Sequence, residues 1–194
     1  PSVTAALPAD ACVRFGPEVP PGNFRPRDPD PSGGFYQPLR VDVDADAAPA
    51  LIAFGLSRIT CKLPNATADL ARQYEQRYVA NRNPTLDEPA VPAAVPAHSA
   101  VELAASWPKD SAEPYLYFDQ LAQALVPRRE AMRLSWFATA GALDVDATAV
   151  GEDDPATRVT TTWHTPAPGP ATLWFVLRDS RGGVATRAVS ITVE

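Results

Sequence analysis

Proline is the residue that most restricts the fold of this sequence. The 194 residues include 22 prolines and 10 glycines, which leave few long stretches free of a residue that breaks helices. Hydrophobic residues nevertheless make up 45% of the chain, a share typical of globular proteins rather than of disordered ones. Together the two properties predict a folded, mainly β chain in which short strands are joined by turns.

The segment 81–194 alternates apolar and polar residues, as strands with one buried face do. The side chains expected on the core faces of its strands are Val101, Leu103, Ala105, Trp107, Leu134, Trp136, Val159, Thr161, Trp163, Leu173, Phe175, Leu177, Val189, Ile191 and Val193. Such short strands predict an immunoglobulin-like antiparallel β-sandwich. An insertion at 112–131 reads as either a hairpin or a short helix, and Gly182 and Gly183 should supply the positive φ angles of the last turn.

Residues 1–80 predict a separate, small β-rich unit. Strands are expected around "ACVRF", "GGFYQPLRVDV" and "LIAFGLSRITCKL", with Pro38 at a sheet edge or a bulge. The segment 17–34 is rich in Pro and Asp and lacks an apolar period, which predicts an extended arm. We expect this arm to contact a partner protein through the aromatic side chains Phe24, Phe35 and Tyr36.

One helix is expected in the same unit, over residues 65–79. Leu70, Tyr74 and Tyr78 recur there at helical spacing and should form a packing face, and either Asn65 or Thr67 is suited to cap its first turn. The motif "NRNPTL" then breaks the helix, because the residue before a proline is pushed out of the helical region. We therefore predict a domain boundary between residues 80 and 81.

Cys12 and Cys61 are the only cysteines of the chain, and they stand in strand-like runs rather than in a CxxC motif. In an exported protein they would form a disulfide bond, whereas in a cytosolic protein they would be two buried free thiols. We favour the disulfide. Closing a loop of this length stabilises a fold by roughly 4 kcal/mol through chain entropy.

The formal net charge of −6 argues against nucleic acid or an anionic membrane surface as the main partner. Two acidic segments, "DVDAD" and "DVDATAVGEDDPAT", contain oxygen ligands of the kind that calcium binds, although neither has the spacing of an EF-hand loop. We favour solvated loops and no cofactor. The alternative is a calcium site, whose ligands would be Asp144, Asp146, Glu152, Asp153 and Asp154.

The segment 81–194 resembles the bacterial PKD-like and cadherin-like members of the immunoglobulin superfamily. The likeness rests on the Asn-x-x-Pro entry in "NRNPTL", a Trp before a small-residue turn in "MRLSWFATAGAL", and the "TTTWHTPAPG" and "RDSRGG" stretches. The residues that stand at the motif positions are Trp136, Trp163, Pro166, Asp179, Gly182 and Gly183. Residues 1–80 resemble, more weakly, exported lipoproteins of Gram-negative bacteria that carry such a module. These modules are non-catalytic and serve as spacers, adhesins or docking elements.

The resemblance implies a non-catalytic structural or docking subunit of a cell-envelope assembly, located in the periplasm or at the outer membrane. We expect its partners to be other protein subunits, and a lipid anchor upstream of Pro1 to be its contact with the membrane. A free-standing adhesin or carbohydrate-binding module is the alternative. A hydrolase is a third reading. It would depend on the carboxylates Glu113, Asp119 and Glu130, because the sequence contains no catalytic motif of a known kind.

Overall fold

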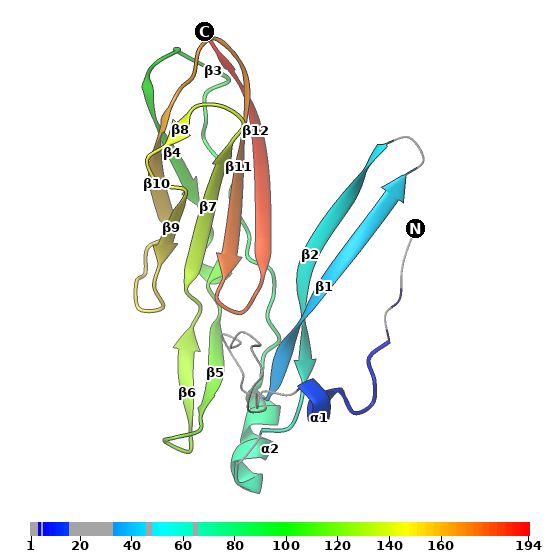
Figure 1. Cartoon of the computed structure of the whole chain (residues 1–194). Helices are drawn as coiled ribbons and strands as arrows, with labels where there is room; N and C mark the ends of the chain where they lie inside the picture. The colour runs from blue at the N-terminus through cyan, green and yellow to red at the C-terminus, as the bar shows by residue number, and fades with distance from the viewer. Residues whose placement is uncertain (1–3, 5, 16–32, 46–47, 64–65) are drawn as a thin grey trace. The chain divides into compact units, whose positions relative to one another are not determined.

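A computed structural model describes residue 4 and residues 6–15, 33–45, 48–63 and 66–194, and the chain divides into two compact units (Figure 1). The N-terminal unit comprises residues 1–79 together with 116–127, and the C-terminal unit comprises 80–115 and 128–194. The chain passes from one unit to the other close to the expected boundary. The inserted residues 116–127, however, belong with the N-terminal unit rather than with the sandwich.

The N-terminal unit contains a long two-stranded ribbon, two helices and most of a second hairpin. The ribbon pairs β1 (Gly34–Ala45) with β2 (Ala48–Thr60) in antiparallel register, with Pro38 opposite Leu56. The insertion at 112–131, for which the sequence allowed either a hairpin or a short helix, is a hairpin of two strands, β5 (Pro114–Asp119) and β6 (Ala124–Arg129). Leu116 and Phe118 of β5 are buried with Leu63 and Tyr74, which explains why this hairpin belongs to the N-terminal unit.

The segment "ACVRF" forms a short helix, α1 (Ala11–Phe15), and the expectation of a strand there is wrong. Local hydrogen bonds decide the outcome. The Asp10 carbonyl accepts from the amides of Val13 and Arg14 at 3.0 Å each, and the Asp10 carboxylate pairs with the Arg14 side chain at 2.6 Å. These hydrogen bonds between residues close in sequence thus outweigh the β preference of Val13 and Phe15.

Helix α2 (Ala68–Arg77) lies inside the predicted range 65–79. Thr67 is its N-cap, and the Leu70 amide donates to the Thr67 hydroxyl oxygen at 3.3 Å. Tyr74 is buried, and its ring centroid lies 5.4 Å from that of Tyr78. The tyrosine stripe is therefore a packing face, as expected from the sequence.

The C-terminal unit is the predicted immunoglobulin-like β-sandwich (Figure 1). A three-stranded sheet has the order β4-β10-β8, and a five-stranded sheet has the order β3-β12-β11-β7-β9. The pairing is antiparallel except between β3 and β12, which run parallel. Its strands, with one 3-10 turn η1, are β3 (Ala94–Val95), β4 (Ala100–Ser106), η1 (Lys109–Ser111), β7 (Met132–Ala138), β8 (Ala142–Leu143), β9 (Ala147–Val150), β10 (Arg158–His164), β11 (Gly169–Asp179) and β12 (Val184–Val193).

The core of the sandwich consists of the side chains that the alternation pattern selects. Phe175 stands opposite Trp136 across β11 and β7, with their ring centroids 5.4 Å apart, and Leu177 stands opposite Leu134. The residues of the predicted core faces that are buried are Leu103, Ala105, Trp107, Leu134, Trp136, Thr161, Trp163, Leu173, Phe175, Leu177, Ile191 and Val193. Half-buried are Val101, Val159 and Val189, which pack against this core.

Replacing Trp136 by Ala is expected to lower the free energy of unfolding of the sandwich by about 3–5 kcal/mol, because a large buried side chain leaves a cavity. The indole N–H of Trp136 also donates to Thr148 Oγ1 at 3.1 Å, and this bond is lost. Urea unfolding measures the change. Trp174→Ala is the matched control, since Trp174 is exposed on β11. A loss below about 1 kcal/mol for Trp136→Ala would place this tryptophan outside the core.

Cys12 and Cys61 form the predicted disulfide bond, which ties α1 to the end of β2. Cys12 lies on the helix rather than in a strand, and Cys61 directly follows the last residue of β2. Because the bond joins residues 49 positions apart, it restricts a large part of the unfolded chain.

Thiol labelling tests the bond directly. The denatured, unreduced protein should take up no reagent, and both cysteines should react after reduction. Reduction is expected to cost the N-terminal unit about 4 kcal/mol of stability, from the entropy of the opened loop. Labelling of both cysteines without reduction would contradict the assignment.

Candidate functional site

Three charged side chains form a buried cluster in the C-terminal unit. The Arg181 guanidinium is fully buried, and it donates from Nε to Glu130 Oε1 at 2.6 Å and from Nη2 to Glu113 Oε2 at 3.3 Å. The ring of Tyr115 lies 4.9 Å from the guanidinium carbon and adds a cation–π contact. An unpaired buried charge is strongly unfavourable, so each member of this cluster requires the others.

The cluster stands where the inserted hairpin leaves the sandwich. Glu113 precedes β5 and Glu130 follows β6. The Glu113 amide donates to Glu130 Oε2 at 2.9 Å, and the Glu130 amide donates to the Glu113 carbonyl at 3.0 Å. Arg181 comes from the turn between β11 and β12, so the cluster fastens both ends of the insertion to that turn.

The turn after β11 is organised by the carboxylate of Asp179. Its Oδ1 accepts from the amides of Arg181 and Gly183 at 2.8 Å each. Gly182 has the predicted positive φ, +100°. Gly183 has no positive φ, so the expectation is wrong at this residue. Glycine is needed at this position for a different reason, because a Cβ there would overlap the Asp179 carboxylate.

The entry motif "NRNP" contacts the same turn. The Asn81 side-chain amide donates to Asp179 at 3.2 Å, and the Val184 amide donates to Asn83 Oδ1 at 3.1 Å. The exposed side chain of Arg82 pairs with Glu113 at 2.5 Å. The "NRNP" and "RDSRGG" segments therefore build one structural junction.

The carboxylates of the hydrolase reading are occupied by structural contacts. Both oxygens of Glu130 accept hydrogen bonds within the cluster, and Glu113 is held by Arg82 and Arg181. Asp119 lies at the tip of the hairpin, where Oδ1 accepts from the amides of Leu121 and Ala122 at 2.9 and 3.0 Å. Each of the three candidate carboxylates is thus held by structural contacts within its own unit.

A polar pocket of about 250 Å³ adjoins the cluster and is lined by Arg82, Asn83, Thr85, Asp110, Ser111 and Glu113. Its groups largely bond to one another. Ser111 Oγ accepts from the Thr85 amide at 3.1 Å, and the Arg82 side chain is held by Glu113. The pocket therefore presents few groups that are available for chemistry on a ligand.

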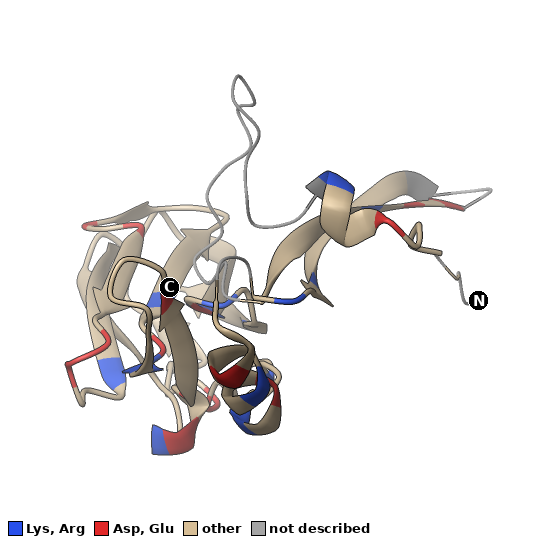
Figure 2. Cartoon of the chain, turned by 90° about the horizontal axis from the view of Figure 1, so that it is seen from below, with Lys and Arg blue, Asp and Glu red and all other residues tan. Residues whose placement is uncertain are grey.

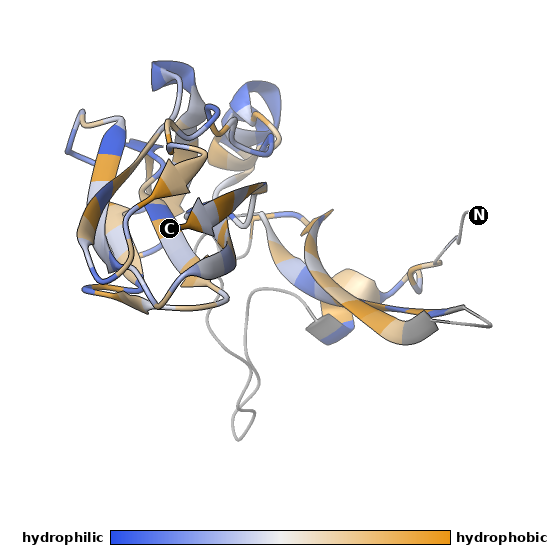
Figure 3. Cartoon of the chain, turned by 90° about the horizontal axis from the view of Figure 1, so that it is seen from above, coloured by the Kyte–Doolittle hydropathy of each residue, from blue (hydrophilic) through white to orange (hydrophobic). Residues whose placement is uncertain are grey.

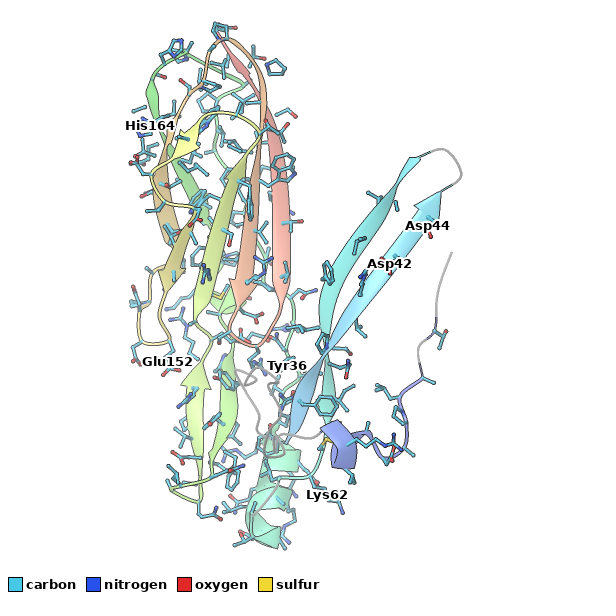
Figure 4. All side chains as sticks on the ribbon, in the orientation of Figure 1. Tyr36, Asp42, Asp44, Lys62, Glu152 and His164 are labelled. Atoms are coloured by element: carbon cyan, nitrogen blue, oxygen red, sulfur yellow. A yellow bond between two sulfur atoms is a disulfide. The ribbon has the colours of Figure 1, made fainter. Side chains whose placement is uncertain are left out.

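The five carboxylates of the candidate calcium site are spread along the sandwich rather than gathered. Asp144 Oδ1 lies 2.7 Å from Nε2 of His164, and this hydrogen bond lowers the pKa of the Asp144 carboxyl. Asp154 Oδ1 accepts from the Ala156 amide at 2.9 Å. Figure 4 shows Glu152 far from His164 in the same unit. In the described part of the chain, no three His, Cys, Asp or Glu side chains are placed to hold a metal ion.

The ribbon of β1 and β2 exposes an unusual amount of apolar surface. Figure 3 shows hydrophobic residues along both strands. Phe54 is 78% exposed and Leu51 is 68% exposed. The exposed apolar side chains, which we call the ribbon patch, are Leu39, Val41, Val43, Leu51, Ile52, Phe54 and Leu56.

The ribbon patch covers both faces of the ribbon, because residues opposite one another in the register share a face. One face carries the three apolar residues of β1 and Leu51. The other carries Ile52, Phe54 and Leu56 of β2, next to the ion pair of Arg40 and Asp42 (Nη2–Oδ1, 2.9 Å). A two-stranded sheet is marginally stable in water, and large exposed apolar patches mark interaction sites.

A smaller aromatic pair lies on the outer face of the sandwich. Phe137 of β7 stands opposite Trp174 of β11, and both side chains are exposed. Neighbouring aromatic rings on one sheet face offer a flat apolar surface to a partner.

The aromatic side chains expected to make the partner contact of the arm are only partly described. Phe35 and Tyr36 are buried, so they are not presented to a partner, and Phe24 lies outside the described residues. The exposed apolar side chains of this unit instead lie further along β1 and on β2. The pattern of "LIAFGL" is equally typical of a buried strand, so the sequence alone does not show that these side chains are exposed.

No family model matches the chain, and no curated protein matches it significantly. Within the described residues, no helix has the length and apolar character needed to cross a membrane.

The buried cluster predicts a pH-dependent stability. Burial raises the pKa of Glu130 above its usual value, and its hydrogen bonds with Arg181 and the Glu113 backbone oppose this effect. The folded protein therefore binds a proton at Glu130 more tightly than the unfolded chain does. This group contributes stability below the usual pKa, and the contribution is lost as the pH rises through the raised pKa.

Urea unfolding between about pH 7 and the usual glutamate pKa measures this dependence. The stability of the wild-type protein relative to Glu130→Gln should increase as the pH falls, because the variant lacks the titrating group. Glu152→Gln, in an exposed loop, is the control. A difference between wild type and Glu130→Gln that stays constant over this range would contradict the assignment.

Proposed function

We propose that this chain is a non-catalytic docking subunit of a bacterial cell-envelope assembly, and that the ribbon patch is its contact surface. The observation that supports this most directly is the exposure of Leu51, Ile52 and Phe54 on a strand pair that has apolar side chains on both faces. Burying one such side chain contributes about 1.5–3 kcal/mol, so a few of them suffice for the centre of an interface.

Further support comes from the disulfide bond and from the resemblance of the sandwich to known modules. The Cys12–Cys61 disulfide is of the kind that persists in an oxidising compartment such as the periplasm. PKD-like and cadherin-like modules, which residues 81–194 resemble, serve as spacers and docking elements. A lipid anchor upstream of Pro1 remains part of this proposal and would hold the chain at the membrane.

A free-standing adhesin or carbohydrate-binding module is the second candidate. It is favoured by the exposed pair Phe137 and Trp174, since aromatic rings stack on apolar faces of ligands, sugar rings included. Trp174→Ala separates the two candidates. It should abolish binding by an adhesin and leave the capture of envelope proteins by a docking subunit unchanged.

The proposal is tested by capture from detergent-solubilised bacterial envelopes, with the intact chain as bait. The double variant Leu51→Asp/Phe54→Asp should lose most of the captured protein, because two carboxylates in a buried apolar interface are strongly unfavourable. Leu121→Asp is the matched control, since Leu121 is 99% exposed at the tip of the other hairpin.

Capture of the same proteins in the same amounts by the double variant and by the control would exclude the ribbon patch as the contact surface. A wild-type bait that captures no envelope protein would count against the docking role itself.

A further inference from the structure

The two outer edges of the ribbon present different backbone groups. The Cys61 amide donates to the Gly33 carbonyl at 2.5 Å, and the register from Gly34 to Val43 continues without a shift. Opposite residues in an antiparallel pair exchange hydrogen bonds at every second position. Odd-numbered residues therefore bond across the ribbon, and even-numbered residues direct their N–H and C=O groups outwards.

The outer edge of β1 is protected against a further strand. Pro38 stands at an outward position and has no N–H to donate. The next outward positions hold the charged residues Arg40 and Asp42. Proline and charge are the usual devices by which proteins block edge strands, so this edge does not accept a partner strand.

Between Leu51 and Ser57 the outer edge of β2 lacks this protection, although Pro49 precedes that stretch and Arg58 follows it. The outward positions of this stretch are Ile52, Phe54 and Leu56, each with an N–H and a C=O, and the next outward position holds Arg58. No charged residue occurs between Ala48 and Ser57, and Figure 2 shows where the charged residues of the chain lie. A long, uncharged, apolar edge is a template for strand addition.

The residue pattern of this edge is symmetric about Phe54. Small residues flank it at Ala53 and Gly55, and branched apolar residues follow at Ile52 and Leu56. When a second copy of β2 runs antiparallel with Phe54 opposite Phe54, Ile52 meets Leu56 and Ala53 meets Gly55, while Leu51 meets Ser57. Cross-strand aromatic and aliphatic pairs of this kind stabilise a sheet.

We propose that a second copy of this chain adds to the β2 edge, forming a symmetric dimer with a four-stranded sheet and Phe54 on the two-fold axis. Phe54 then exchanges two backbone hydrogen bonds with its counterpart, and Ile52 pairs with Leu56 of the other copy. The charges of Arg40 and Asp42 stand one strand away from the axis and neutralise each other. The inference rests on the proposed function, because it names the first partner of the ribbon.

Phe54→Pro tests the proposal in the full chain. It removes an outward N–H and a large side chain without removing a hydrogen bond between β1 and β2. Analytical ultracentrifugation of the wild-type protein should give a dimer, and the dissociation constant should rise by about tenfold or more in the variant. Arg40→Pro is the matched control, since Arg40 stands opposite Phe54 and faces the other edge. It should leave the dissociation constant unchanged.

A second variant tests the same dimer in case Phe54→Pro does not fold. Phe54→Cys should form a covalent dimer under mild oxidation, because the two cysteines meet at the axis, whereas Leu39→Cys should not. A wild-type protein that is monomeric at all concentrations would overturn the proposal. A dimer whose dissociation constant rises more with Arg40→Pro than with Phe54→Pro would overturn it as well. A monomer that still captures envelope proteins through the ribbon patch would refute the dimer alone. A Phe54-dependent dimer that captures none would refute the envelope role alone.

Discussion

The guanidinium of Arg181 is buried and bears a charge that must be matched inside the protein. Glu130 and Glu113 supply that match, and the ring of Tyr115 covers the group. The two carboxylates stand at the two ends of an inserted hairpin. The same interaction that neutralises the arginine therefore decides where the chain leaves the sandwich and where it returns. Asp179 fixes the backbone of the turn from which Arg181 projects, so the junction is specified from both sides.

The sandwich could be predicted from the sequence because each of its strands has one face in the core. Leu134 and Trp136 on β7 alternate with more exposed residues, and this period shows directly which side is buried. The short helix α1 could not be predicted in this way. Its hydrogen bonds to Asp10 are local, but they compete with an apolar pattern that is equally typical of a strand.

The ribbon shows a different limit of sequence analysis. Leu51 and Ile52 are adjacent and point to opposite faces, as in a strand that is covered on both sides. The pattern indicates that both faces are apolar, but it does not say what covers them. The buried cluster was beyond reach for another reason. Glu113, Glu130 and Arg181 are separated by 17 and 51 positions, and nothing in the local sequence distinguishes them from solvated charges.

The inserted hairpin also has a consequence for how this architecture can be inherited. Because residues 116–127 contribute Leu116 and Phe118 to the small core around Tyr74, the N-terminal unit is encoded in two separate stretches of the gene. A recombination event that transferred only the first stretch would deliver an incomplete core. One that transferred only the sandwich would carry an apolar hairpin without the residues that bury it. We therefore expect the two units to be inherited together rather than to recombine as separate domains.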